Sequence, residues 1–290
     1  MEVTLLLAAG GLLAGVFGAL LGLGGGILIV PLLTLGFGVP FREAVAVSLL
    51  AVITTSSAGA AVYLRQRLAN LRLGLTLELA TALGALVGGL VAFTVSDRLL
   101  AGAFAILLVY TATSMLRSRS TDRAPGLDEL PAGASETVLQ AADDTDAWVG
   151  YAATLGGSGY GVRRLPLGLV LSWFAGIVSA LLGVGGGTVK VPAMHLVMGV
   201  PLRVATATSN LMIGVTASAS ALLYLARGAV DPLLAGPVVV GVFVGAAGAS
   251  RAAGRVPVGV LRLLFVLVLG YVALEMAARA LGISLLGPAR

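Results

Sequence analysis

Lys190 is the single lysine of the chain, and it stands in the apolar stretch LLGVGGGTVKVP. An ammonium group at the centre of a membrane helix costs about 2.5–3.5 kcal/mol on insertion scales, so such a residue suggests a function. The chemistry open to it is the binding of an anion through a charge-assisted hydrogen bond. The alternative is a lysine whose long side chain reaches the nearer headgroups from a short segment.

Two glycine triplets interrupt apolar runs at matching places: Gly24, Gly25 and Gly26, and Gly185, Gly186 and Gly187. Pro31 and Pro192 each follow five residues after the last glycine. Such a break frees backbone N–H groups, and the helix that starts there has partial positive charge at its N-terminus. Two broken helices near the membrane midplane are a recurring anion site. The triplets therefore predict part of a substrate-binding site; the alternative is a tight turn or close helix packing.

Hydroxyl and amide side chains complete the candidate substrate-binding set: Ser48 in the first half, and Thr188, Thr208, Ser209 and Asn210 in the second. Most serines and threonines of membrane helices bond back to their own helix. The amide of Asn210 cannot be satisfied so locally. It is therefore either a hydrogen-bonding contact between helices or a ligand contact.

The membrane segments lack the groups that an enzyme needs. They carry one histidine, His195, no cysteine, and the carboxylates Glu78 and Glu275, which lie in different halves. Motifs such as HExxH, GxSxG and the phosphate loop are absent. We therefore expect no catalysis, no metal and no cofactor. His195 is predicted to be a packing or interfacial residue, and Glu78 to form an interfacial salt bridge near Arg72.

Composition places these residues in a membrane. Hydrophobic residues make up 58% of the 290, charged residues only 11%, and the mean hydropathy is +1.05. Several nearly uncharged stretches of about 18 or more residues are long enough to cross roughly 30 Å of hydrocarbon as helix. The predicted fold is an all-α polytopic membrane protein of the cell inner membrane or plasma membrane. Its net charge of +5 comes from loop arginines, which indicates membrane orientation and no nucleic-acid binding.

The chain is a duplication, visible when the sequence is shifted by 161 residues. AGVFGALLGLGGGILIVPLLTLGFGVPFREAVAVS from Ala14 aligns without a gap with AGIVSALLGVGGGTVKVPAMHLVMGVPLRVATATS from Ala175. The homologous repeats are residues 1–117 and 165–290, and the polar segment 118–164 is predicted to be a cytoplasmic linker. Its last part predicts a small hairpin, and for its first part a disordered chain is equally compatible.

Each repeat predicts about five helical segments, broken at glycine and proline residues. In the first repeat they are 3–21, 27–37, 42–64, 73–95 and 99–116, and in the second 166–182, 188–198, 203–225, 232–250 and 257–280. The second segment of each repeat is short, so it is either a tilted crossing or a re-entrant half-helix. Gly84-x-x-x-Gly88 and Gly241-x-x-x-Gly245 are predicted to be helix-packing surfaces.

Loop charges favour repeats that insert in opposite senses. The loop 65–72 is rich in arginine, whereas its counterpart 226–233 is not, and the reverse bias separates 96–98 from the loop with Arg251 and Arg255. This pattern predicts inverted repeats of five crossings each, with the glycine-broken short helices near the midplane and both termini outside. The alternative treats the short segments as non-crossing, which leaves four crossings per repeat, parallel repeats and both termini inside.

Around the triplets the sequence contains GLGGGILIVPLL…GVPFREAVAVSLLAV and GVGGGTVKVPAMHLVMGVPLRVATATSNLMI. In these motifs, and over nearly its whole length, it resembles the sulfite exporter TauE/SafE family of membrane transporters. The resemblance implies a secondary transporter or permease for small anions, in particular sulfur oxyanions and organosulfonates such as sulfite, sulfoacetate or sulfolactate.

The predicted function is therefore secondary transport of a small anion across the lipid bilayer by alternating access. The alternatives are an anion channel, a carrier for a non-sulfur organic anion, and a membrane scaffold without transport. The sequence leaves open the direction of transport, a coupling ion (proton or sodium) and a homodimer.

Overall fold

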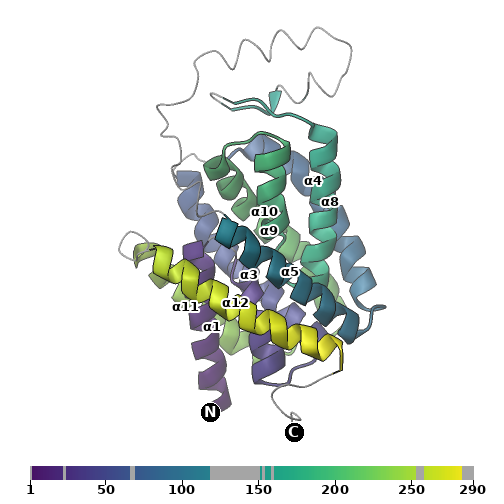
Figure 1. Cartoon of the computed structure of the whole chain (residues 1–290), viewed down its shortest axis with the longest axis vertical. Coiled ribbons are helices and arrows are strands. Elements are labelled where there is room, and N and C mark those ends of the chain that lie inside the picture. Colours follow the sequence, from purple (N-terminus) through teal and green to yellow (C-terminus); the bar gives the residue numbers. More distant parts are fainter. Residues whose placement is uncertain are drawn as a thin grey trace.

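The computed structural model describes residues 2–21, 24–65, 69–117, 151, 154–157, 160–252 and 258–282, and almost all of them are helical (Figure 1). The elements are α1 (Glu2–Leu21), α2 (Gly26–Pro31), η1 (Leu32–Gly36), α3 (Phe41–Arg65), α4 (Leu71–Ala92), α5 (Asp97–Arg117), α8 (Leu165–Leu182), α9 (Gly187–Pro192), η5 (Ala193–Val197), α10 (Leu202–Ala226), α11 (Pro232–Ala252) and α12 (Val258–Ala280). Within these ranges the predicted hairpin of the linker is reduced to one isolated bridge between Gly157 and Tyr160. Most of the predicted linker, including the part predicted to be disordered, lies outside the described residues.

Of the described helices, eight are long and apolar enough to cross a membrane: α1, α3, α4, α5, α8, α10, α11 and α12. Their outward faces expose large apolar side chains such as Leu75, Leu79 and Leu267. A soluble protein does not expose apolar surface on this scale, whereas lipid accepts it. The predicted all-α, multi-pass membrane fold is confirmed.

The short second segment of each half changes from α-helix to π-helix after its proline. α2 ends at Pro31 and continues as η1, and α9 ends at Pro192 and continues as η5. Proline has no N–H to donate to the preceding turn, so the regular ladder of hydrogen bonds is interrupted and the next turn can widen. Each short segment is therefore an irregular helix that spans about half the length of its neighbours.

Each short segment also folds back along the helix before it. In the first half a Cβ built on Gly10 would meet the side chain of Leu32, which places the start of η1 beside the middle of α1. In the second half the N–H of Arg163, just before α8, donates to the carbonyl oxygen of Met198 at 3.0 Å. The pairs α1/α2–η1 and α8/α9–η5 are therefore helical hairpins whose tips are the glycine triplets.

Each half also packs one of its long helices against the hairpin of the other half. α4 packs along α8, and α11 packs along α1. A Cβ on Gly84 would overlap the carbonyl oxygen of Trp173 on α8, and one on Gly245 would overlap that of Leu12 on α1. Glycine is thus what allows the backbones to approach. The predicted packing role of both GxxxG pairs is confirmed.

Gly245→Ala should lower the melting temperature of the detergent-solubilised protein by several degrees. The added methyl group would overlap the backbone of α1, and overpacking of this kind costs about 1–3 kcal/mol. Gly248→Ala, on an open face of the same helix, is the matched control and should melt like the wild type. Equal melting temperatures for the two variants would contradict the packing described for α11.

Side chains mark the two ends of the helical bundle. At one end Arg42 Nε donates to the carbonyl oxygen of Ala92 at 3.1 Å, which joins the start of α3 to the end of α4. At the other end Asn70 Nδ2 donates to the carbonyl oxygen of Leu155 at 2.7 Å, which joins the start of α4 to the segment before α8. In Figure 1 the start of α1 and the end of α12 lie toward the bottom, and the start of α8 lies at the top. The inverted insertion of the repeats stays a prediction.

A labelling experiment tests that prediction. In intact cells a cysteine introduced at Ser118 should be shielded from an impermeant maleimide, because the linker is predicted to be cytoplasmic. A cysteine added at the C-terminus should be labelled, because both termini are predicted to lie outside. The chain has no cysteine of its own, so no background labelling interferes. The opposite pattern would favour parallel repeats with four crossings each.

Candidate functional site

The two glycine triplets meet at the centre of the fold, between α3 and α10. Cβ atoms built on Gly24 and on Gly185 would both contact Val52 of α3 and Ile213 of α10. Four of the six glycines have backbone angles that L-residues rarely adopt. Their φ angles are 75° at Gly24, 72° at Gly25, 79° at Gly185 and 73° at Gly186. The tips of the two helical hairpins therefore face each other in the interior.

Around the first triplet the hydroxyl groups are occupied by backbone carbonyls. Ser48 Oγ lies 2.7 Å from the carbonyl oxygen of Gly183 and 3.1 Å from that of Gly26. Thr55 Oγ1 donates to the carbonyl oxygen of Gly24 at 2.7 Å. Ser48, one of the predicted site residues, thus joins the two hairpin tips.

Around the second triplet three buried hydroxyl groups have no hydrogen-bond partner among the residues that the structure describes: Ser179, Thr188 and Ser209. A Cβ on Gly186 would lie 3.3 Å from Ser179 Cβ, and one on Gly187 would lie 3.6 Å from Ser209 Oγ. We call these five residues the second-triplet cluster. Leaving a buried hydroxyl unpaired costs about 1–3 kcal/mol. A ligand with several acceptor oxygens would recover that cost here.

The first half has no equivalent of this cluster. At the offset of 161, Ser179 corresponds to Gly18 and Thr188 corresponds to Ile27. Ser209 corresponds to Ser48, whose hydroxyl is occupied. Sequence reasoning missed Ser179. Its signal was a serine on the helix before the triplet, at a position where the other repeat has glycine.

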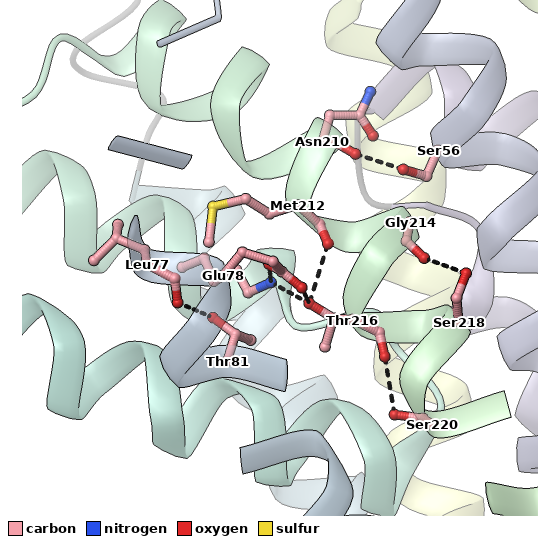
Figure 2. Close-up of polar contacts among 11 residues, drawn as sticks. Ser56, Leu77, Glu78, Thr81, Asn210, Met212, Gly214, Thr216, Ser218 and Ser220 are labelled. Carbon is pink, nitrogen blue, oxygen red and sulfur yellow. Dashed lines mark hydrogen bonds and ion pairs between the residues drawn. The ribbon is translucent and has the colours of Figure 1, made fainter. Parts of the chain in front are cut away.

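Lys190 lies beside this cluster, and its side chain is 1% exposed, so it does not reach the headgroups. Its Nζ donates to Thr216 Oγ1 at 2.7 Å and forms an ion pair with Glu78 Oε2 at 3.3 Å. Thr216 Oγ1 in turn donates to Glu78 Oε1 at 2.7 Å (Figure 2). The prediction that Glu78 forms an interfacial salt bridge near Arg72 was wrong. Because α4 packs against α8 and α10, Glu78 faces the interior.

Two other predicted site residues make contacts away from the triplets. Thr208 Oγ1 accepts the backbone N–H of Asn70 at 2.9 Å, at the start of α4. The side chain of Asn210 lies against Gly59 of α3, and its backbone carbonyl accepts the hydroxyl of Ser56 (Figure 2). The structure therefore brings together the triplets, Ser48, Thr188, Ser209 and Lys190, while Thr208 and Asn210 face neighbouring helices.

A cavity of about 260 Å³ lies elsewhere, where η1, α5 and α12 meet. Arg279 Nη1 donates to the carbonyl oxygen of Thr34 at its wall, at 2.8 Å. Its polar lining also includes Asp97 and Arg98. None of the predicted site residues lines this cavity, so it is distinct from the hairpin tips.

Comparison with known proteins identifies the family. The profile of the sulfite exporter TauE/SafE family matches residues 7–276. The chain belongs to the TauE/SafE family. A curated relative, the probable membrane transporter protein YunE of Bacillus subtilis (strain 168), is 27% identical over 242 residues, which cover 81% of this chain and 83% of that protein. No solved structure matches.

As a member of the TauE/SafE family, the chain is a multi-pass membrane transporter. The family match extends from α1 into α12 and includes both glycine triplets. Glu78 and Lys190 also lie within it. All the candidate site residues therefore lie within the part of the chain that the family profile matches.

Proposed function

We propose that this TauE/SafE transporter is a secondary carrier of small sulfur-containing anions, sulfur oxyanions or organosulfonates such as sulfite and sulfoacetate. The observation that carries the proposal is the second-triplet cluster, with three unpaired buried hydroxyls beside the single lysine of the chain. Hydroxyl groups donate hydrogen bonds to oxyanion oxygens, and an ammonium group adds a charge-assisted bond. The family's description as sulfite exporters supports the sulfur class.

Alternating access is supported by the arrangement of the hairpins. α1 with α2–η1 returns toward the end where it started, and so does α8 with α9–η5. Three long helices follow each hairpin: α3, α4 and α5 in the first half, and α10, α11 and α12 in the second. Because three is an odd number, each half ends at the end of the bundle opposite to the one where it began. This arrangement is the one expected of repeats that insert in opposite senses, as the loop charges predict. A substrate held at the hairpin tips would be approachable from one end or the other.

A counterflow screen in proteoliposomes tests the substrate class. Vesicles loaded with sulfite, thiosulfate, sulfate, taurine, sulfoacetate or acetate are diluted into a trace of the same radiolabelled compound. A carrier of sulfur anions should accumulate label transiently and saturably for at least one sulfur anion. A channel shows flux without counterflow, and accumulation of acetate alone would favour a non-sulfur carrier. Counterflow of none of the six would overturn the proposed class.

Ser209→Ala should weaken the apparent affinity for the transported anion several-fold, because it removes one of the unpaired hydroxyls of the second-triplet cluster. Ser57→Ala is the matched control. The hydroxyl of Ser57 is exposed and donates to its own helix, to the carbonyl oxygen of Ile53 at 2.8 Å. Half-saturation in counterflow is the measurement. Equal half-saturation in both variants would exclude Ser209 from the site.

A further inference from the structure

The ion pair between Glu78 and Lys190 is not required to build the fold. At the offset of 161, Glu78 of the first repeat corresponds to Val239 of the second. Lys190 and Thr216 of the second repeat correspond to Ile29 and Thr55 of the first. At this symmetry-related place the hairpin of the first half forms in the same way and α11 packs against α1, without a charge at either position. Buried ion pairs contribute little net stability, because desolvation offsets their attraction. A pair of charges inside the bundle that the fold can do without indicates a role in function.

Lys190 is the charged group that faces Glu78 among the described residues. α8 carries no charged side chain between Leu165 and Leu182, and on α10 the one charge, Arg203, is exposed at its start. Arg72, on the same helix as Glu78, is exposed at the start of α4. His195 of η5 is bound to a backbone carbonyl. A change in the charge of Glu78 therefore acts electrostatically mainly on Lys190.

We propose that Glu78 carries the coupling proton of transport, and that its protonation frees Lys190 to bind the anion at the second-triplet cluster. This inference rests on the proposed function as an anion carrier. It names the coupling ion and ties it to the same site.

The geometry allows Lys190 to exchange Glu78 for the anion as its charged partner. A proton added to the carboxylate of Glu78 makes a neutral carboxylic acid, so the Coulomb attraction to Lys190 is lost. Lys190 keeps its charge, and its Cε lies 3.5 Å from the position of a Cβ on Gly186, so its flexible stem already runs beside the cluster. An anion held there replaces the lost negative charge. When the anion leaves, the pair re-forms and the proton departs from Glu78.

Proton and anion should therefore bind cooperatively and travel in the same direction, one proton with each anion. By linkage, a bound proton strengthens anion binding by the same factor as a bound anion strengthens proton binding. Apparent anion affinity should rise as the pH falls. Sodium gradients should have no effect.

Proteoliposomes loaded with a pH dye separate coupling from transport. Thiosulfate and sulfoacetate are the probes, because both stay fully ionised near neutral pH and carry no titrating proton of their own. Wild-type protein should show counterflow at equal pH, and an inward proton gradient should raise net uptake at least tenfold with acidification of the lumen. Counterflow without acidification would overturn the proton proposal alone. Absence of counterflow for all six compounds of the screen would contradict the proposed function itself.

Glu78→Gln is the decisive variant, because glutamine has the shape of the protonated acid and no charge: its amide oxygen can accept from Lys190 Nζ, and its NH2 group can donate to Thr216 Oγ1. It should retain counterflow and lose both gradient-driven uptake and acidification. Glu275→Gln, at the other buried carboxylate among the described residues, is the matched control and should keep the coupling. If Glu78→Gln does not fold, Glu78→Val replaces it, because the second repeat holds Val239 at the equivalent position and Lys190 is kept. Lumen acidification driven by anion uptake in either variant would overturn the proposal.

Discussion

Replacing Gly186 by leucine should abolish transport while the protein still reaches the membrane. The backbone of Gly186 has φ of 73°, a left-handed conformation that costs an L-residue roughly 1–2 kcal/mol. A Cβ there would lie 3.1 Å from the carbonyl oxygen of Ala175 and 3.3 Å from Ser179 Cβ. The rest of the leucine side chain would have to displace part of the second-triplet cluster. Counterflow and membrane content, measured together, check this expectation.

Gly25→Leu should have the same effect, since Gly25 has φ of 72° and lies at the tip of the other hairpin. Gly36→Leu is the matched control, because a side chain at Gly36 would meet open space. It should transport like the wild type. Wild-type flux in Gly25→Leu or Gly186→Leu would show that the triplet concerned only forms a turn and is not part of the substrate site.

Lys190→Met should weaken the apparent anion affinity at least roughly tenfold, the equivalent of about 1.4 kcal/mol. Methionine keeps most of the length of the side chain and removes its charge, so the anion loses its charge-assisted partner. Expression should be unchanged. Half-saturation in counterflow is again the measurement, and an unaltered value would mean that Lys190 only supports the helix.

The loss of Lys190 also leaves Glu78 without its partner, so the double variant Lys190→Met with Glu78→Gln is the control. It removes both charges and keeps the interior neutral. The same loss of affinity in the double variant assigns the effect to the missing ammonium group. Wild-type affinity in the double variant would show that an unpaired Glu78, and not the missing lysine, weakens binding.

The helices themselves were predictable, because glycine and proline break the apolar runs where the elements end. Predicted segments and observed helices differ by at most three residues at any end, the largest difference being at the end of α4. His195, predicted to be a packing or interfacial residue, is half-buried, with Nδ1 2.9 Å from the carbonyl oxygen of Val200. Local pattern sufficed for these features, since each depends on neighbours in the chain.

The ion pair was not predictable in the same way, because it depends on which helix of one half packs against the other. Glu78 stands in α4 and Lys190 in α9, and only the packing of α4 against α8 and α10 brings them together. A signal was present in the sequence. Each is an isolated charge inside an apolar segment, the two have opposite signs, and neither has a partner on its own helix. Thr216 gave no signal, since membrane threonines usually bond to their own helix.

The most direct test of the central claim is to locate a bound anion by anomalous scattering. Crystals of the protein would be grown with selenite, the heavier analogue of sulfite, or with 2-bromoethanesulfonate. We expect the selenium or bromine peak at the second-triplet cluster, within hydrogen-bonding reach of Ser209 and Thr188 and beside Lys190. A peak confined to the cavity lined by Arg98 and Arg279, with none at the cluster, would contradict it.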